Sequence, residues 1–239
     1  MSDSIFPLGL AGLTYRQTED CFPVGTDSVL LSAFVRVSKR AKVCDLGCAG
    51  GILPLLLCGR HEEIKVTGIE ISEKAAAVAR ENAERNNLSD RIEIITADMR
   101  TVSLPAGSFD TVVCNPPYYK ENSGRLPKKT SMQAARAETS CTIEEVCATA
   151  VRLLRFGGIF FSVYKPARLC ELLSAMEASK LTPKRLRFVL HKQGQAPVLV
   201  LVEGKKGAAP GLIVPPALVI RKSTGAYTAE AYRIYHPDE

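Results

Sequence analysis

The sequence predicts an α/β protein built on a doubly wound, mostly parallel sheet, and two features of the chain predict it. Short, continuously apolar runs alternate with helix-like segments from about residue 41 to residue 203. Continuously apolar strands are typical of parallel sheets that helices cover on both faces. The last two apolar runs are separated only by a short Gln-Gly-Gln turn region, which indicates a hairpin. We therefore expect one antiparallel strand at an edge of the sheet.

The first half of the pattern begins with the apolar run at 41–46, which we expect to be a buried strand. Glycine-rich residues follow it, and the apolar run at 52–57 predicts a helix. A second strand is expected at 64–70, and a helix at 73–87, where strong helix formers are concentrated. Ser72 is placed to cap the amino terminus of that helix.

The second half continues the alternation of strands and helices. Two further apolar runs predict strands at 91–96 and 109–114. Thr142 and Glu145 form a capping-box pattern that predicts the start of a helix. The glycine pair at 157–158 is expected to end this helix before a strand at 159–164. The remaining elements are a helix at 169–176, the hairpin strands 184–191 and 196–203, a Gly/Pro/Lys-rich loop at 204–216, a short strand at 217–221 and a helix at 228–235.

Composition and charge indicate an ordinary globular protein of 239 residues, with 46% hydrophobic and 23% charged residues. No apolar run reaches the roughly 20 residues that a membrane-spanning helix needs, and the amino terminus lacks the features of a signal peptide. We therefore expect a cytoplasmic protein. The formal net charge of +6 is a mild bias towards a polyanionic partner. Basic residues gather in two segments, which contain Arg125, Lys128, Lys129 and Arg136, and Lys180, Lys184, Arg185, Arg187 and Lys192.

The eight cysteines and three histidines give no sign of a metal site. None of the cysteines forms a Cys-x-x-Cys pair, and several lie inside apolar runs, which is typical of buried, reduced thiols in a cytosolic protein. Cys44 and Cys48 are four residues apart, but no second pair or histidine cluster completes a zinc site. His61, His191 and His236 show no pairing pattern and are expected at the surface.

The segment DLGCAGG at 45–51 leaves the first strand and enters a helix. Glycines in such a turn let a ligand approach main-chain N–H groups closely, and open parallel sheets bind ligands at this edge. Glu70 closes the second strand about 20 residues later, where a carboxylate accepts hydrogen bonds from ribose hydroxyls; the alternative is a solvated acid at a strand end. Asp98 follows the third strand and either accepts a hydrogen bond from an adenine amino group or caps a helix.

Four segments in this order resemble the motifs of class I S-adenosylmethionine (SAM) methyltransferases: DLGCAGG at 45–51, GIEIS at 68–72, TADMR at 96–100 and CNPPYY at 114–119. The resemblance implies a Rossmann-like sheet of seven strands with a reversed edge strand. It also implies SAM as the cofactor, with S-adenosylhomocysteine as the product. The residues that the resemblance assigns to the cofactor are Gly25, Thr26, Asp27, Asp45, Gly47, Cys48, Ala49, Gly51, Glu70, Ile71, Asp98, Met99 and Asn115.

Segments outside these motifs are similar to one family, the bacterial enzymes that methylate N6 of adenine 37 beside the anticodon of valine tRNA. The similar segments lie at 20–34, 160–173 and 219–235, so the resemblance covers nearly the whole chain. It implies tRNA as the partner and a methyltransferase domain at 41–203. Residues 1–40 are then expected to contribute to the cofactor pocket, and residues 204–239 to form a loop and a short helix packed on the same domain. A monomer without metal or membrane contact is expected.

The sequence departs from this family in two places. Family members commonly have Gly where this chain has Ala49, and alanine is strained wherever φ is positive. Related sequences often read Ala-Arg-His-Glu where residues 135–138 read Ala-Arg-Ala-Glu. No role of that histidine transfers to this chain, although Arg136 and Glu138 remain.

The segment NPPY at 115–118 suits methyl transfer to an exocyclic amine, and we assign all four residues to catalysis. The side-chain oxygen of Asn115 and the carbonyl of Pro116 would accept the two amine hydrogens and so help to localise the nitrogen lone pair. Pro117 keeps this acceptor pair rigid, and Tyr118 offers a ring on which the base stacks. The loop that follows is either an RNA-binding cover or a solvated basic loop. Its candidate RNA contacts, together with Tyr118, are Tyr119, Lys120, Arg125, Lys128, Lys129 and Arg136.

Three alternatives remain open from the sequence. NPPY also occurs in enzymes that methylate a glutamine side chain in release factors, which usually carry a separate helical amino-terminal domain. Only about 40 residues precede the first strand here, which counts against that alternative. A second alternative is methylation of guanine N2 or adenine N6 in ribosomal RNA. The third, a non-catalytic RNA-binding protein of the same fold, is disfavoured because Asn115 and the acids are intact.

Overall fold

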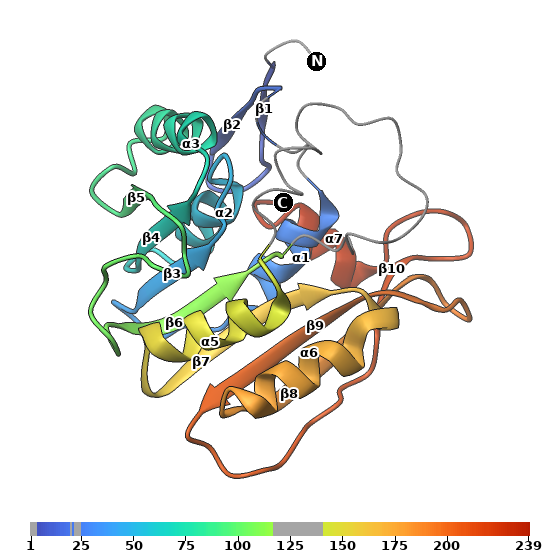
Figure 1. The fold of residues 1–239 in the computed structure, drawn as a ribbon. Helices are drawn as coiled ribbons and strands as arrows, with labels where there is room; N and C mark the ends of the chain where they lie inside the picture. Colours follow the sequence, from blue (N-terminus) through green and yellow to red (C-terminus); the bar gives the residue numbers. More distant parts are fainter. Residues whose placement is uncertain (1–3, 20, 22–24, 117–140) are drawn as a thin grey trace.

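The computed structural model describes residues 4–19, 21, 25–116 and 141–239 of the chain (Figure 1). Within these residues, eight strands form one sheet in the order β10-β8-β9-β7-β6-β3-β4-β5. They are β3 Lys42–Leu46, β4 Lys65–Glu70, β5 Ile92–Thr96, β6 Phe109–Cys114, β7 Leu154–Tyr164, β8 Leu181–Lys192, β9 Pro197–Lys206 and β10 Leu218–Arg221. A separate antiparallel hairpin consists of β1 Ser4–Pro7 and β2 Thr14–Gln17.

Helices cover both faces of the sheet (Figure 1). One face carries α1 Thr26–Phe34, α2 Ile52–Arg60, α3 Glu73–Arg85 and α7 Ala229–Tyr235. The other face carries α5 Ile143–Leu153 and α6 Leu169–Ala178, with a short 3-10 helix, Pro166–Arg168, before α6. The strands are apolar on both sides because both sides are buried: Val43 belongs to the first core and Cys44 to the second. The predicted doubly wound α/β fold is confirmed.

The sheet has eight strands rather than the expected seven, because the short strand near the carboxyl terminus, β10, pairs in parallel with β8 and extends the sheet. The reversed strand is β9, which is antiparallel to both β7 and β8. It lies between them, so β8 and β10 are outside it. This order arises because the segment containing α6 carries the chain past one strand position, and the β8–β9 hairpin returns to fill that position.

The glycine pair at 157–158 does not end a helix, contrary to the sequence prediction. Helix α5 ends at Leu153, and β7 begins with the next residue. The glycines lie inside β7, whose register with β6 shifts between Phe109 and Thr111. Gly157 has a φ of 76°, a conformation that few other residues adopt. The pair therefore serves an irregularity within the strand, which apolar periodicity does not reveal.

Two asparagines on α3 dock the amino-terminal hairpin onto the rest of the protein. Asn82 accepts the N–H of Arg16 at 2.8 Å and donates to the carbonyls of Arg16 and Gly50, both at 3.0 Å. Asn86 makes the same pair of bonds with the backbone of Thr14, at 2.9 and 2.8 Å. The sequence contained a signal for this docking, because asparagine is a poor helix former and two asparagines four residues apart lie in the last turn of this helix and at its C-cap.

Candidate active site

The carboxyl ends of β3, β4 and β6 bring the motif residues together at one edge of the sheet. Asp45 lies opposite Gly68 of β4 and opposite Val113 of β6, so the segments that follow these strands emerge side by side. The Gly-rich turn follows β3, Glu70 ends β4, and Asn115 comes directly after β6. This is the edge at which open parallel sheets bind their ligands.

Three residues of the Gly-rich turn have left-handed backbone conformations, with φ values of 76° at Gly47, 47° at Ala49 and 83° at Gly51. Position 49 therefore requires a positive φ, and its alanine is strained. Glu70 holds the turn: its Oε2 accepts the N–H of Ala49 and its Oε1 accepts the N–H of Ser72, each at 2.8 Å. A carboxylate oxygen has two acceptor sites, so these bonds fix Glu70 without using up its capacity to accept ligand hydroxyls.

Asp45 is the buried carboxyl group of the site. It is 2% exposed, and its Oδ2 has no hydrogen-bond partner among the residues that the structure describes. Burial, and then the nearby charge of Glu70, raise the pKa of Asp45 to about 8. A buried acceptor without a partner is costly, so the position suits a ligand that brings a hydrogen-bond donor or a positive charge. SAM carries an ammonium and a sulfonium, and the residues present therefore fit the cofactor that the motifs imply.

Asp98 is held by Arg100 and caps no helix, since residues 97–108 form turns and irregular structure. Arg100 donates from Nε to Oδ1 at 3.0 Å and from Nη2 to Oδ2 at 2.6 Å, and its main-chain N–H reaches Oδ1 at 2.9 Å. The side-chain bonds from Arg100 lower the pKa of Asp98 and keep it an acceptor. Met99 turns back towards the Gly-rich turn, and its methyl carbon would lie 3.7 Å from a Cβ placed on Gly47.

Asn115 is linked to the first turn of α1 by Ser28. Its Nδ2 donates to Oγ of Ser28 at 3.1 Å, and Ser28 is buried. Because the donor and the acceptor of a carboxamide are different atoms, this bond turns Oδ1 away from Ser28. Pro116, which follows, is also buried. Sequence reasoning missed Ser28, since no local pattern points to a partner 87 residues away.

The residues assigned to the start of α1 lie next to this contact. Gly25 is the N-cap of α1, and Thr26 and Asp27 form its first turn with Ser28. Oδ2 of Asp27 lies 4.0 Å from Nζ of Lys165, which follows β7. The other assigned residues lie outside the described part of the chain; they are Pro117, Tyr118, Tyr119, Lys120, Arg125, Lys128, Lys129 and Arg136.

The cysteines and histidines contribute no further site. Six of the eight cysteines are buried, and burial raises the pKa of Cys48, which belongs to the Gly-rich turn, so its thiol stays neutral. His191 is exposed as expected, whereas His61 is half-buried with its Nε2 enclosed, because it directly follows α2 and packs on the protein. Within the described residues, no group of His, Cys, Asp and Glu is arranged to hold a metal ion. None of the described helices combines the length and apolarity needed to cross a membrane.

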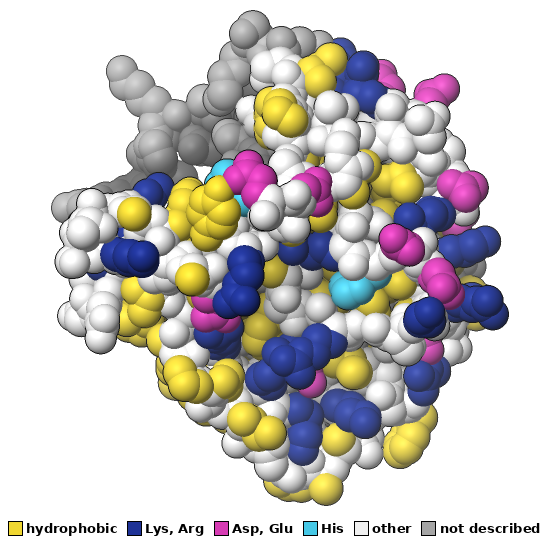
Figure 2. All heavy atoms as spheres, turned by 180° about the vertical axis from the view of Figure 1, so that it is seen from behind, with side chains coloured by type: hydrophobic (Ala, Val, Ile, Leu, Met, Phe, Trp, Pro, Cys, Tyr) yellow, Lys and Arg dark blue, Asp and Glu magenta, His cyan; other side chains and the backbone are white. Residues whose placement is uncertain are grey.

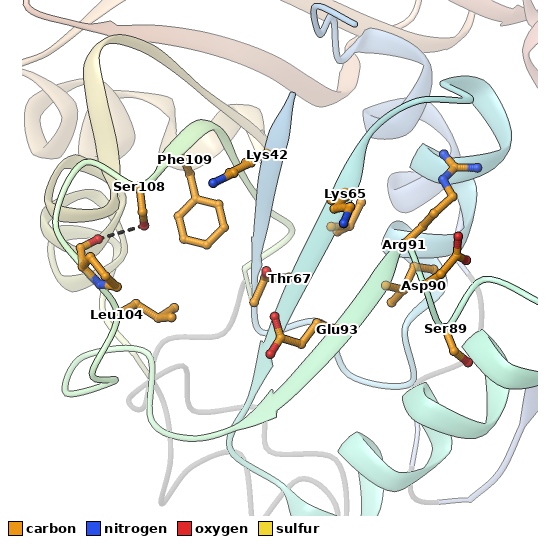
Figure 3. A pocket seen from close by; sticks show the side chains of 13 residues that line it. Lys42, Lys65, Thr67, Ser89, Asp90, Arg91, Glu93, Leu104, Ser108 and Phe109 are labelled. Atoms are coloured by element: carbon orange, nitrogen blue, oxygen red, sulfur yellow. Dashed lines mark hydrogen bonds between the residues drawn. The ribbon is translucent and has the colours of Figure 1, made fainter. Parts of the chain in front are cut away.

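A hollow of about 340 Å³ lies at the amino ends of the strands, at the other end of the sheet from these residues (Figure 3). Lys42, Lys65 and Phe109, which begin three of the strands, line it together with Glu93. Ligands of open parallel sheets bind at the carboxyl ends of the strands, and none of the residues assigned above lines this hollow. We therefore assign it no part in the site.

Comparison with known proteins identifies the family and the fold of the chain. Residues 21–180 match the methyltransferase small domain family. Three curated relatives carry the name tRNA1(Val) (adenine(37)-N6)-methyltransferase. That of Cronobacter sakazakii is 31% identical over 210 residues and covers 84% of each chain. That of Porphyromonas gingivalis is 30% identical and covers 92% of this chain and 90% of its own, and that of Escherichia coli is 30% identical with 97% and 96% covered.

Solved structures share the fold. A protein of Agrobacterium tumefaciens described as a predicted O-methyltransferase, Atu636, has a TM-score of 0.73 at 23% identity, with 87% of this chain and 95% of that chain covered. A geranyl diphosphate methyltransferase in complex with SAM has a TM-score of 0.55 at 15% identity, with 75% and 84% covered. At these identities the likeness shows the fold alone.

Proposed function

The chain belongs to the bacterial tRNA1(Val) (adenine(37)-N6)-methyltransferase family, and from this premise we propose the reaction that it performs. It transfers a methyl group from SAM to the exocyclic N6 amino group of an adenine in tRNA, with adenine 37 of valine tRNA as the expected target. One observation carries this proposal: the Asn115 carboxamide is fixed by Ser28 at 3.1 Å, beside the acids that fit the cofactor.

Three acids hold the cofactor, each by different means. Asp45 presents a buried carboxyl group with an open acceptor to the cationic end, and it ionises when that end binds. Glu70 accepts the ribose hydroxyls with oxygens that the backbone already fixes, and Asp98 accepts the adenine amino group while Arg100 keeps it ionised. When bound, SAM supplies an electrophilic methyl group on its sulfur. The other residues proposed to border it are Gly25, Thr26, Asp27, Gly47, Cys48, Ala49, Gly51, Ile71, Met99 and Asn115.

Asn115 and Pro116 activate the amine. The aromatic amine is a poor nucleophile, because its lone pair is delocalised into the ring. Oδ1 of Asn115 and the carbonyl of Pro116 accept its two hydrogens, which helps to localise the lone pair and aims it at the methyl group. Both acceptors are held before the substrate arrives, one by Ser28 and one by proline geometry, so little reorganisation is needed in the transition state. As the carbon–nitrogen bond forms, the carbon–sulfur bond breaks, and the proton of the methylated amine passes to water.

The remaining parts of the proposal concern the substrate and the setting. Pro117 keeps the acceptor pair rigid, and Tyr118 stacks on the extruded adenine. Extruding the adenine costs little free energy in an anticodon loop, because the bases there are already unpaired. The loop after it contacts RNA phosphates. Residues 1–40 and 204–239 support the domain at 41–203: Asn82 ties the hairpin to the Gly-rich turn, and the carbonyl of Ile234 accepts a bond from Arg60 at 2.7 Å. A tRNA substrate implies a cytoplasmic enzyme.

The test is mass spectrometry of nucleosides from unmodified tRNA incubated with the protein and SAM. We expect N6-methyladenosine in wild-type reactions and its formation at least about 100-fold more slowly with Asn115→Ala. Isotopic labelling of a release-factor protein instead of tRNA would overturn the proposal. Methylguanosine, or methylation only of ribosomal RNA, would likewise replace the proposed substrate.

A further inference from the structure

The second basic segment of the sequence, which runs from Lys180 to Lys192, contributes side chains to two different parts of the surface. Figure 2 shows Lys and Arg side chains gathered over the face opposite to that of Figure 1, with acidic side chains among them. Arg185 pairs with Glu203 at 2.8 Å, and its guanidinium lies 3.8 Å from the ring centre of Phe34. Arg187 makes two bonds to Glu230, at 2.7 and 2.9 Å. These two arginines fasten α1 and α7 to the sheet, and their charges are neutralised there.

Lys192 lies elsewhere, at the active-site end of β8. Tyr164, the last residue of β7, pairs with Val200 of β9, and Val200 pairs with Phe188 of β8. Strands β7 and β8 run in the same direction, because both are antiparallel to β9. Lys192 is four residues beyond Phe188, and at a rise of 3.3 Å per residue it extends about 13 Å past the end of β7. Lys192 therefore lies beyond the carboxyl ends of β6 and β7, the end of the sheet at which Asn115 also lies.

Lys222 lies beside Lys192, on the neighbouring strand. Arg221, the last residue of β10, is paired in register with Lys192, and Lys222 follows it. The chain from Lys192 to residue 196 and the chain from Lys222 to residue 228 therefore form two adjacent turns, which we call the turn pair. Figure 1 shows both on the right of the sheet.

The tips of the turn pair are free of neighbouring atoms, and the second turn is held by contacts of Arg221. Gly194 and Gly225 have φ values of 80° and 90°, and no atom would lie within 4 Å of a Cβ on either. Arg221 donates to the carbonyl of Gly225 at 2.7 Å and lies 4.4 Å from the ring centre of Tyr227, which fixes the second turn. Lys222 is exposed and Lys192 half-buried, and neither forms an ion pair with any described residue.

A chain of packed side chains connects the turn pair to the proposed catalytic residue. Tyr227 stacks on Tyr235 of α7 with ring centres 5.1 Å apart. Helix α7 packs on α1, and Asp27 in the first turn of α1 lies close enough to Tyr235 for its charge to act on the hydroxyl. Asp27 precedes Ser28, which holds Asn115.

We propose that the turn pair binds the phosphate backbone of the tRNA on one side of the methylated adenine, with Lys192 and Lys222 as the phosphate contacts. The inference rests on the proposed function, since it takes tRNA as the substrate. Strand β8 is three strand positions from β6, which at about 4.8 Å each is about 14 Å across the sheet. Together with the offset of about 13 Å along the strands, this separates Lys192 from Asn115 by about 20 Å. That separation excludes the target base and suits a flanking nucleotide. Cations without ion pairs suit phosphate, because neutralising it releases counterions.

The test compares tRNA binding by wild-type protein with that of the double variants Lys192→Glu/Lys222→Glu and Lys192→Gln/Lys222→Gln. We expect the dissociation constant for tRNA to rise at least about tenfold with the glutamates and less with the glutamines. The slope of log affinity against log salt should fall by about 0.7–0.9 for each lost phosphate contact. SAM affinity, measured by calorimetry, and the turnover number at saturating tRNA should stay at wild-type values, which also shows that the variants fold.

The matched control is Lys42→Glu/Lys65→Glu, which makes the same charge change at two exposed lysines on the opposite edge (Figure 3). The affinity of this control for tRNA should stay within about twofold of the wild-type value. Unchanged tRNA affinity in the turn-pair variants overturns the inference while leaving the proposed function standing. An equal loss in the control also overturns it, because the effect is then one of net charge. Wild-type protein that neither binds nor methylates tRNA refutes the proposed function itself.

Discussion

The cofactor side and the RNA side of the active-site edge are built in opposite ways. At the ends of β3 and β4, acidic side chains are buried or bound to the backbone: Asp45 is 2% exposed, and Glu70 accepts two main-chain N–H groups. At the ends of β8 and β10, Lys192 and Lys222 carry positive charge without an ion pair to any described residue. Acidic groups that the protein already holds in position suit a small ligand that the protein encloses. An RNA backbone is bound instead by the sum of many cationic contacts.

This difference implies that the two sides respond differently to substitution. A single change on the cofactor side should alter SAM affinity strongly, and a single change on the RNA side should alter tRNA affinity in small increments. Asn115 stands between them, after β6 and against Ser28 of α1. Although it borders SAM, it should affect the chemical step much more than the affinity for either ligand.

The largest expected effect comes from Asn115→Ala. Removing one preorganised hydrogen-bonding group that acts in the transition state lowers turnover by about 100- to 1,000-fold. SAM and tRNA affinities should stay within about threefold of wild type. Single-turnover methylation with both ligands saturating, together with calorimetry for SAM, separates these quantities. A loss of SAM affinity equal to the loss of turnover would move Asn115 to the cofactor side.

The next effect is on stability, from Asn82→Ala. The change removes the bonds to the N–H and carbonyl of Arg16, which are partly buried, and to the carbonyl of Gly50, which is buried. At about 1 kcal/mol for each lost bond, the free energy of unfolding should fall by about 3 kcal/mol, or about 6–12 °C in Tm for a chain of this length. The matched control is Asn87→Gly, because Asn87 is exposed and its φ of 55° is one that glycine tolerates. Thermal denaturation that shifts equally in both variants would contradict the docking role of Asn82.

Asp45 makes the cofactor side sensitive to pH. Its pKa is raised from 3.8 to about 8, so between these values the folded protein holds a proton that the unfolded chain has released. Its contribution to stability therefore falls as pH rises from about 4 to 8. A cationic ligand favours the ionised form, so SAM binding should release this proton, and affinity should rise by at most about tenfold per pH unit up to pH 8.

Asp45→Asn is the comparison that isolates this carboxylate. The variant should bind SAM about 10- to 100-fold more weakly at pH 8, the loss expected for a hydrogen bond to a charged group, and its affinity should not depend on pH in this window. Calorimetry in two buffers of different ionisation enthalpy measures the released proton directly. Proton release that persists in the variant would assign it to another group.

Much of the fold is encoded in short-range patterns of the sequence. Apolar runs locate the seven main strands, and the Ser72 and Thr142 caps mark two helix starts that the structure confirms. The hairpin β1–β2 escapes detection because its four-residue strands have no clear period and depend on Asn82 for docking. The prediction for the glycines at 157–158 is wrong because a helix end and a strand irregularity require the same conformational freedom.

The site divides in the same way. The Gly-rich turn and Glu70 are predictable, because each motif is local and its strand end places it. The Ser28–Asn115 bond joins residues 87 positions apart, and no local pattern encodes it. The second basic segment looks like one cluster in the sequence, which does not reveal that Glu203 and Glu230 neutralise its two arginines. A cluster of charges in the sequence therefore does not show which of them are exposed and unpaired on the surface. A local motif, by contrast, does show which strand end it follows.

The smallest expected effect, and the sharpest check on the cofactor side, comes from Ala49→Gly. Alanine at a φ of 47° is strained by about 1 kcal/mol, whereas glycine loses about 0.4–1 kcal/mol through the greater freedom of the unfolded chain. The two terms nearly cancel, so the free energy of unfolding should change by less than about 0.5 kcal/mol. SAM affinity should stay within about twofold, because Glu70 fixes the N–H of residue 49 whichever side chain it carries. A gain of about tenfold in calorimetric SAM affinity would instead mean that the alanine distorts the turn, and that the backbone bonds of Glu70 do not by themselves set its shape.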